Sequence, residues 1–130
     1  MSKPALIAVL PLTLAACVTP AASASPPDPT LTYLHFGQTG TVDGPRIAPL
    51  SLIEDSRCPA SVACAWAGQV RVTVRIMTGR GAVVREMTSS RPVAVADGSL
   101  ELVDVRPVKR TEAAIPARDY RLGFRFRGGL

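Results

Sequence analysis

Hydrophobic and polar residues alternate along much of the second half of the chain. In the run 70–76 every second residue is Val or Ile, and the residues between them are Arg and Thr. In the run 120–127 aromatic and aliphatic residues alternate with Arg and Gly. Successive side chains of a β-strand point to opposite faces, so this period of two predicts strands with one buried face.

Turn residues separate further strand candidates. The sequence Thr78–Gly81 predicts a hairpin loop leading into residues 82–88. Asp97-Gly98 is a strong tight-turn signal and predicts a second hairpin between residues 93–95 and residues 100–105. The second half of the chain is therefore expected to be a series of short antiparallel strands.

The remaining segments are less regular. The alternation slips at Leu102-Val103, which predicts a β-bulge. Residues 33–36 and 50–53 are shorter strand candidates, and residues 109–115, flanked by two prolines, are the one candidate for a short helix. About six to eight short strands with frequent turns predict an all-β domain, either a small antiparallel β-sandwich or a barrel.

The N-terminal region has a different pattern, typical of an export signal. Lys3 precedes an apolar run, residues 5–16, that is shorter than the roughly 20 residues needed to span a bilayer. The run leads into Leu14-Ala15-Ala16-Cys17, the pattern of a bacterial lipobox. We therefore expect residues 1–16 to be a cleaved lipoprotein signal peptide and Cys17 to carry acyl chains such as palmitate. A buried N-terminal strand or helix, and secretory cleavage without lipid, are the alternatives.

A linker and a single domain are expected to follow the lipid. Residues 17–30 are rich in Pro, Ala and Ser, a composition that favours an extended, disordered spacer. The β-domain is then expected over residues 31–130, held at the membrane by two or three acyl chains. Val18 follows the cysteine, and by resemblance to proteobacterial lipoproteins a residue other than Asp there implies the outer membrane, facing the periplasm.

Cysteine usage adds a covalent constraint to this domain. The chain has three cysteines. Once Cys17 carries lipid, Cys58 and Cys64 remain, in an oxidising compartment. An even count of cysteines in a secreted domain predicts that these two form a disulfide.

The residues around the two cysteines have expected structural roles. Asp55 and Ser56 can bond local backbone amides, and Pro59 stiffens the loop. Trp66 is expected to lie across one end of the apolar core. Gly68 allows a close approach or an unusual dihedral angle where the chain enters the next strand.

Two adjacent runs in this region form a distinctive motif. They are Asp55-Ser56-Arg57-Cys58-Pro59 and Cys64-Ala65-Trp66-Ala67-Gly68. In this order and spacing they resemble a motif of small, uncharacterised bacterial lipoproteins. The similarity extends loosely to Gly37-Gln38 and Asp119-Tyr120, so it covers most of residues 31–126. The resemblance implies a lipid-anchored β-domain and transfers no catalytic residue.

The cysteine loop is the leading candidate for a binding site. We expect a non-enzymatic binding or structural module whose candidate recognition loop contains Asp55, Arg57, Pro59 and Trp66. For the loop itself, the simplest interpretation is a structural disulfide staple with Trp66 in the core. The alternative function is an inhibitor of a periplasmic or extracellular protease through the Cys58–Cys64 loop, with Arg57 presented as a substrate-like side chain on a rigid loop.

Patterns for catalysis and metal binding are weak. His35 is the sole histidine, which excludes a His-Glu-x-x-His zinc site and leaves a hydrolase using His35 as a minor hypothesis. Cys-x-x-Cys redox spacing is absent from the sequence. Glu54 and Asp55 are adjacent, so in a strand they point to opposite faces. We therefore expect no enzymatic activity, no metal and no cofactor.

The charge balance is basic, with a net charge of +5. Solvated outward faces explain the positive charge near the end of the chain most simply. Alternatively, this charge contacts anionic lipid headgroups or envelope polysaccharide, where each cation contributes about 1 kcal/mol. Expected partners are the membrane and an envelope protein or glycan, and no nucleic acid. The candidate basic patch consists of Arg118, Arg121, Arg125 and Arg127.

Overall fold

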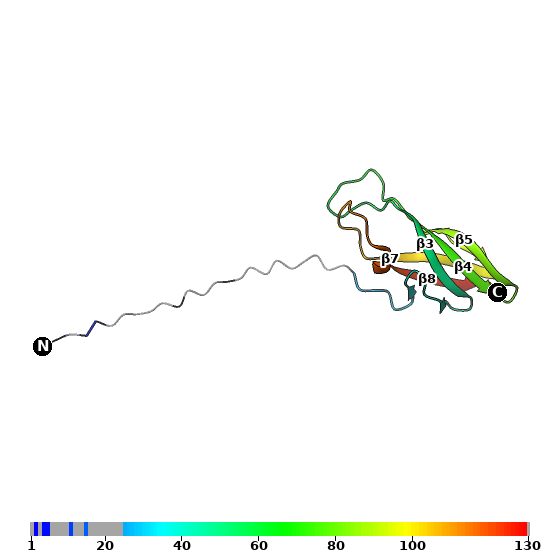
Figure 1. The fold of residues 1–130 in the computed structure, drawn as a ribbon, viewed down its shortest axis with the longest axis horizontal. Coiled ribbons are helices and arrows are strands. Elements are labelled where there is room, and N and C mark those ends of the chain that lie inside the picture. Colours follow the sequence, from blue (N-terminus) through cyan, green and yellow to red (C-terminus); the bar gives the residue numbers. More distant parts are fainter. Residues whose placement is uncertain (1, 3, 6–10, 12–14, 16–24, 130) are drawn as a thin grey trace.

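The protein folds as a β-sandwich. The computed structural model describes residues 25–129, together with residues 2, 4, 5, 11 and 15. Its described part contains two antiparallel four-stranded sheets that enclose one apolar core and do not close into a barrel, which confirms the all-β prediction (Figure 1). The strands are β1 (Thr32–Leu34), β2 (Gly40–Thr41), β3 (Arg46–Asp55), β4 (Val70–Thr78), β5 (Gly81–Thr88), β6 (Val93–Val95), β7 (Gly98–Arg106) and β8 (Arg121–Gly128).

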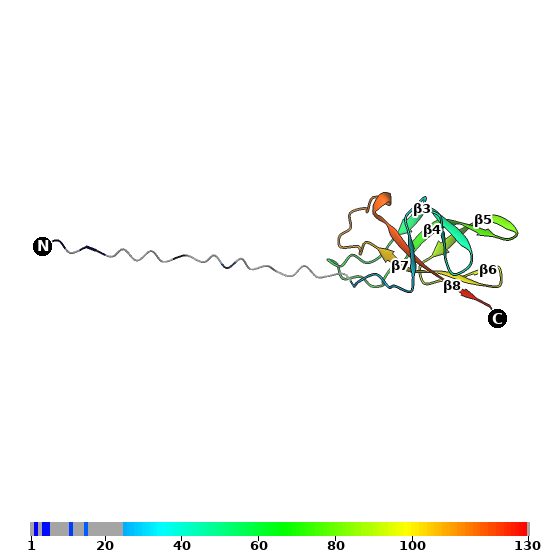
Figure 2. The same ribbon diagram turned by 90° about the horizontal axis from the view of Figure 1, so that it is seen from below.

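One sheet combines the first strand with the last three, whereas the other consists of four consecutive strands. One sheet has the order β1-β8-β7-β6 and the other the order β2-β3-β4-β5. In both views the loop 56–69 and the start of the continuous segment 25–129 lie at one end, and the β4–β5 turn and the C-terminus lie at the other (Figures 1 and 2). We call these the loop end and the hairpin end.

The alternation seen in the sequence supplies the core. Val70, Val72, Val74 and Ile76 of β4 have no exposed surface. They pack in one cluster with Leu100 and Leu102 of the other sheet, and Phe126 packs against this cluster, partly buried. The buried members of the final run are Tyr120, Leu122 and Phe124.

The turns and the bulge lie where the sequence predicts them. Thr78 pairs with Gly81, which closes the β4–β5 hairpin, and Val95 pairs with Gly98 in the second hairpin. The register between β7 and β8 shifts between Leu102 and Asp104, at the predicted bulge. The bulge lets both Leu102 and Val105 face the core, although a regular alternation would place them on opposite faces.

Strand β3 is longer than the predicted residues 50–53. It extends over Arg46–Asp55 and contains Pro49, which has no N–H to donate to a neighbouring strand. The register between β3 and β4 shifts between Pro49 and Ser51. A proline is accommodated at such an irregularity, so its presence does not end the strand.

The predicted helix over residues 109–115 is wrong. This segment is irregular, and the short helical element is a 3₁₀ turn at Ala117–Asp119. The carbonyls of Lys109 and Arg110 accept hydrogen bonds from Ala60 N (3.0 Å) and Ser61 N (3.3 Å) of the loop. These carbonyls are therefore bonded to another segment and not to amides one helical turn ahead.

The N-terminal predictions fall largely beyond this structure. Cys17 and most of the predicted signal peptide lie outside the described residues. In the part of the chain that is described, no helix has the length and apolar character to cross a membrane.

Candidate recognition loop at one end of the sandwich

The loop 56–69 connects the two longest strands of its sheet and is closed by a disulfide. Cys58 and Cys64 are bonded, with an S–S distance of 2.09 Å and a Cα–Cα distance of 5.9 Å, which confirms the predicted pairing. The loop projects beyond the strands in Figure 1. Because it has no partner strand, its shape depends on the disulfide and on the side chains at its base.

Asp55 organises the base of the loop. Its carboxylate accepts hydrogen bonds from Arg57 Nε (2.8 Å) and Nη2 (2.7 Å) and from Tyr120 Oη (2.7 Å). Arg57 N also donates to it at 3.3 Å. Only 7% of the Asp55 side chain is exposed. The last residue of β3 is thus tied to the start of the loop and to the residue that precedes β8.

Arg57 is fully engaged as well. Besides the paired contact with Asp55, its Nη1 donates to the carbonyl oxygens of Val105 and Pro107, each at 3.0 Å. This places the guanidinium between the end of β7 and the loop. All three of its nitrogen atoms have acceptors, as a largely buried charge requires.

These contacts shift the pKa values of two groups in opposite directions. Burial alone raises the pKa of Asp55, but the hydrogen bonds from Arg57 and Tyr120 and the charge of Arg57 outweigh it, and lower this pKa to about 2. Burial, and then donation to the Asp55 carboxylate, raise the pKa of Tyr120 to about 12. At neutral pH the carboxylate is ionised and the phenol is protonated, which is the pairing that the hydrogen bond needs.

The irregular segment 107–116 packs alongside the loop and forms hydrogen bonds with it. Lys109 Nζ donates to the backbone oxygen of Asp55 at 2.9 Å. Ala60 and Ser61 donate their amides to carbonyls of this segment. Pro59, which follows the first cysteine of the disulfide, is buried. The loop is therefore held on one side by covalent closure and on the other by a second loop.

Gly68 closes the base of the loop where it enters β4. Its φ is +71°, a left-handed conformation that favours glycine, and a Cβ at this position would lie 1.8 Å from the Ser56 carbonyl oxygen. Ser56 Oγ accepts from Gln69 N at 3.0 Å. The predicted roles of Ser56 and Gly68 are both confirmed.

Trp66 is not part of the core, so its predicted position is wrong. Its side chain is 80% exposed, more than any other large hydrophobic residue in the described part of the chain. Val62 of the same loop is 42% exposed, and Val108 below it is 44% exposed. The buried core cluster consists of Tyr120, Phe124 and aliphatic residues and does not include Trp66.

The four residues predicted for recognition therefore separate into two groups. Asp55, Arg57 and Pro59 point inward and build the loop, whereas Trp66 points outward. An inhibitory role with Arg57 as the presented side chain would require its guanidinium to leave all of its acceptors. Sequence reasoning misses Tyr120 and Lys109 as members of this network, because both are far from Asp55 in sequence.

The four arginines of the candidate basic patch do not form one free cationic surface. Arg125 is paired with Glu101 at 2.9 Å, and the Arg121 guanidinium lies 5.3 Å from the ring centre of Tyr33. Arg118 is 84% exposed, 3.8 Å from Asp119, and belongs to the loop end. Arg127 is exposed near the hairpin end. Two of the four arginines thus have a carboxylate partner, and the four are divided between the two ends of the domain.

His35 acts as a structural residue. Its Nδ1 lies 2.9 Å from the carbonyl oxygen of Tyr120, and its backbone N donates to Gln38 Oε1 at 3.0 Å. Within the described residues, no three His, Cys, Asp or Glu side chains gather as a metal site. The geometry around His35 thus provides a hydrogen bond between two segments of the chain.

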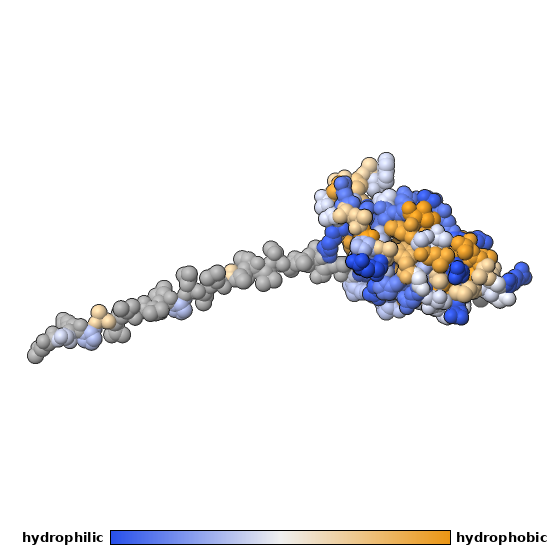
Figure 3. All heavy atoms as spheres, viewed as in Figure 1, coloured by the Kyte–Doolittle hydropathy of each residue, from blue (hydrophilic) through white to orange (hydrophobic). Residues whose placement is uncertain are grey.

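Exposed hydrophobic residues also occur away from the loop. Figure 3 shows them over the region of β3 to β5. Val84 is 59% exposed there and Ile53 is 44% exposed. Val84 lies in a regularly paired part of β5 and Ile53 at a register shift of β3, whereas Trp66 lies on a projecting loop.

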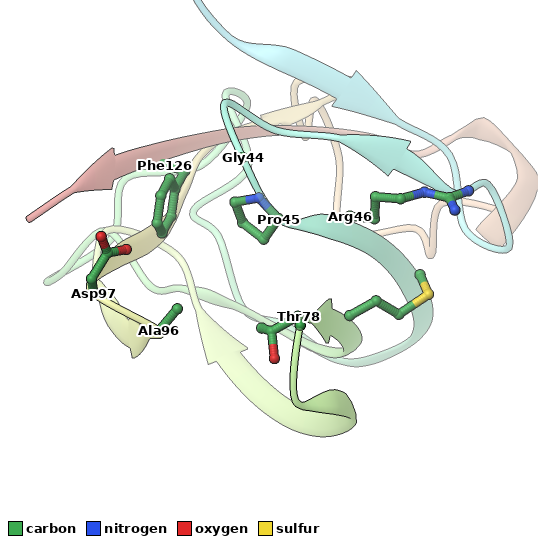
Figure 4. Close-up of a pocket in the computed structure, with 9 residues that line it drawn as sticks. Gly44, Pro45, Arg46, Thr78, Ala96, Asp97 and Phe126 are labelled. Carbon is green, nitrogen blue, oxygen red and sulfur yellow. The ribbon is translucent and has the colours of Figure 1, made fainter.

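The hairpin end carries two shallow hollows. One, of about 420 Å³, lies between Phe126 and Asp97 on one side and Pro45 and Thr78 on the other (Figure 4). The second, of about 750 Å³, opens between the β4–β5 hairpin and β6. Both are open to solvent, and their walls combine turn residues with residues of the adjoining strands.

Comparison of the chain with protein-family models, with curated proteins and with solved structures finds no match. The resemblance to small lipoproteins stays a prediction. The function of this protein must therefore be inferred from its geometry and from the residues of its N-terminal region.

Proposed function

We propose that this protein is a lipid-anchored component of the bacterial cell envelope, at the outer membrane and facing the periplasm. Its β-sandwich is a non-enzymatic binding module that acts through loop 56–69. The observation that carries the proposal is the 80% exposure of Trp66 on a loop that a disulfide and a buried ion pair hold in place.

A loop that is ordered before binding has a lower entropic cost of association. A flexible loop loses conformational entropy when it binds, and a loop held before binding loses less. Tryptophan is enriched among the residues that dominate binding energy at interfaces, since it buries a large apolar surface and offers one N–H. The buried network fixes the loop, and the indole remains outside it. This division of roles fits a surface built to contact a partner.

The anchor is tested by mass spectrometry of the mature protein. We expect an N-terminal Cys17 that carries acyl chains, and a Cys17→Ser variant that is not acylated. A mature protein that begins elsewhere without lipid would contradict the anchor. This experiment leaves the role of the loop untouched.

The loop is tested by photo-crosslinking in living cells. A photoreactive phenylalanine analogue at position 66 is compared with the same analogue at position 84, which is exposed on a regular strand. We expect crosslinks to an envelope component from position 66 and few from position 84. Equal yields at both positions would show that the loop is not the binding surface.

Protease inhibition through Arg57 is not proposed. The Arg57 side chain is 19% exposed, and its guanidinium is bonded to the Asp55 carboxylate and to two carbonyls. Substitution of Arg57 would weaken the whole loop, so a loss of inhibition in such a variant would not identify a contact residue.

A further inference from the structure

We infer that the loop end of the sandwich rests on the membrane surface, with Trp66 at the level of the lipid headgroups. The inference rests on the proposed lipid anchor at Cys17. It assigns to the same loop a definite partner, the bilayer that carries the anchor.

The first observation is where the described chain begins. Arg106 Nη2 donates to the carbonyl oxygen of Pro26 at 2.9 Å. Arg106 is the last residue of β7, next to Pro107, which accepts from Arg57. The segment leading toward Cys17 therefore starts at the loop end, as Figures 1 and 2 both show.

The second observation is the length of chain between Pro26 and Cys17. Nine residue steps separate the two, and at about 3.3 Å per residue they span at most about 30 Å. Strand β4 has nine residues and is about 30 Å long at the rise of a β-strand. Because Pro26 lies at the loop end, this end can contact the bilayer whether the segment between Cys17 and Pro26 is compact or fully extended. The hairpin end touches the bilayer only if the sandwich turns over and the tether runs along its whole length.

The third observation is what the loop end presents to a surface. Trp66, Val62 and Val108 are the exposed hydrophobic residues of the loop and of the segment below it. Tryptophan is enriched at membrane interfaces, because its ring is apolar and its N–H can bond to headgroups or water. The disulfide keeps the loop projecting when no partner is present.

The charge of residues 107–119 is mildly favourable for contact with an anionic bilayer. Lys109, Arg110 and Arg118 come from the supporting segment and the turn after it, and Glu112 and Asp119 oppose them. The Asp55 and Arg57 charges cancel. Within residues 107–119 these three cations and two carboxylates leave one net positive charge. Contact with the bilayer is therefore expected to depend mainly on the indole and only weakly on salt.

The anchor also explains how a small apolar contact suffices. A tethered domain meets the surface at a high effective concentration, so a weak contact is populated without strong intrinsic affinity. The surface that Trp66 and its neighbours offer need not hold the protein at the membrane. It needs only to orient a domain that the acyl chains already hold there.

The test uses the single tryptophan of the chain as its reporter. The acylated protein is reconstituted in vesicles of phosphatidylethanolamine and phosphatidylglycerol, with and without lipids brominated on their acyl chains. We expect Trp66 emission to shift to shorter wavelength, and the brominated lipids to reduce it by about twofold. Raising the salt concentration should change this quenching little.

A matched control places the reporter on the far half of the domain. The double variant Trp66→Phe, Val84→Trp carries its indole at another exposed position. We expect its emission to stay at long wavelength and to be quenched by soluble acrylamide and not by brominated lipid. Equal quenching by brominated lipid at positions 66 and 84 would overturn the proposed orientation.

The outcomes separate the inference from the anchor. Protein that fails to float with vesicles contradicts the lipid anchor and the inference together. Protein that floats, with Trp66 still emitting as a solvent-exposed indole, overturns the inference alone. In that second case, crosslinks from position 66 to an envelope protein would identify the loop as a protein-binding surface.

Discussion

The two ends of the sandwich are stabilised by different means. At the loop end, irregular backbone over residues 56–69 and 107–116 is held by a disulfide, a buried ion pair and bonds from Tyr120 and Lys109. At the hairpin end, regular strand pairing continues into short turns, and the space between the sheets stays open. Polar side chains and a covalent link are thus concentrated where the backbone has no strand partner.

This difference shows where an exposed hydrophobic side chain is evidence for a binding surface. Loops on a rigid scaffold commonly carry binding residues. At the loop end, the groups that hold the loop are buried, and Trp66 takes no part in holding it. Toward the hairpin end, the exposed residues Val83 and Val84 lie on β5, and the pairing of β5 with β4 determines their positions. Matched substitutions at the two ends test this difference, in order of decreasing expected effect.

The largest effect is expected for Asp55→Asn. The substitution leaves the Arg57 guanidinium largely buried without its counter-ion, so we expect a loss of about 3 kcal/mol in the free energy of unfolding. The matched variant at the hairpin end is Asp97→Asn, at an exposed turn residue, with an expected change within about 0.5 kcal/mol. Urea denaturation measures both, and similar losses for the two variants would contradict the contrast between the ends.

The second prediction compares two glycines with positive φ. At the loop end, Gly68→Ala combines a strained dihedral with a Cβ only 1.8 Å from a carbonyl oxygen, and we expect a loss of about 2–3 kcal/mol. At the hairpin end, Gly81 has φ +116°, and an added Cβ would meet no atom within 4 Å, so Gly81→Ala should cost about 1 kcal/mol through the dihedral alone. Thermal denaturation gives the order, and a reversed order would show that the Gly68 backbone yields easily.

The third prediction concerns the disulfide. Cys58→Ser combined with Cys64→Ser opens a short loop, and the chain-entropy relation gives a loss of about 2 kcal/mol. Because the Asp55–Arg57 network remains, we expect strands and core to stay folded, with faster proteolysis confined to the loop. Limited proteolysis with mass spectrometry locates the cuts. First cuts at the β4–β5 turn would mean that the hairpin end, and not the loop end, is the weaker site.

The smallest effect is expected from pH. The pKa of Asp55 is lowered to about 2, so its contribution to stability is complete above its ordinary value of 3.8 and is lost as pH falls through 2. The pKa of Tyr120 is raised from 10.0 to about 12, so its contribution is complete below pH 10 and is lost as pH rises through 12. We expect Tyr120→Phe to reduce the loss of thermal stability above pH 10, while Asp97→Asn leaves it unchanged. An alkaline profile unaffected by Tyr120→Phe would refute the assignment.

Much of the fold follows from local sequence patterns. Alternation identifies β4 and the inward side of β8, and the Asp97-Gly98 turn identifies a hairpin. These signals are local, because a strand with one buried face shows its period within a few residues. The prediction for residues 109–115 fails since their backbone bonds to a loop some 50 residues earlier, a partner that no local pattern reveals.

The candidate site is less predictable for the same reason. The disulfide follows from the cysteine count and the expected compartment, and the bonding roles of the side chains at 55 and 56 follow from residue type. The direction of Trp66 does not, because an aromatic residue beside a strand is as compatible with burial as with exposure. Tyr120 is correctly predicted to face inward, yet Asp55, the partner of its hydroxyl, lies in the other sheet.

Strand β5 has one further consequence, for contacts between copies of the chain. It is the only long strand in the described part of the chain that lies at the edge of a sheet, so a row of its backbone N–H and C=O groups faces solvent. Arg85 pairs with Val74 and therefore points toward the gap between the sheets. A neighbouring molecule that added its own strand to β5 would have to dehydrate this guanidinium, and inward-pointing charge is a known defence of sheet edges. If the proposed anchor confines copies of the chain to a common membrane surface, this arginine disfavours their pairing edge to edge.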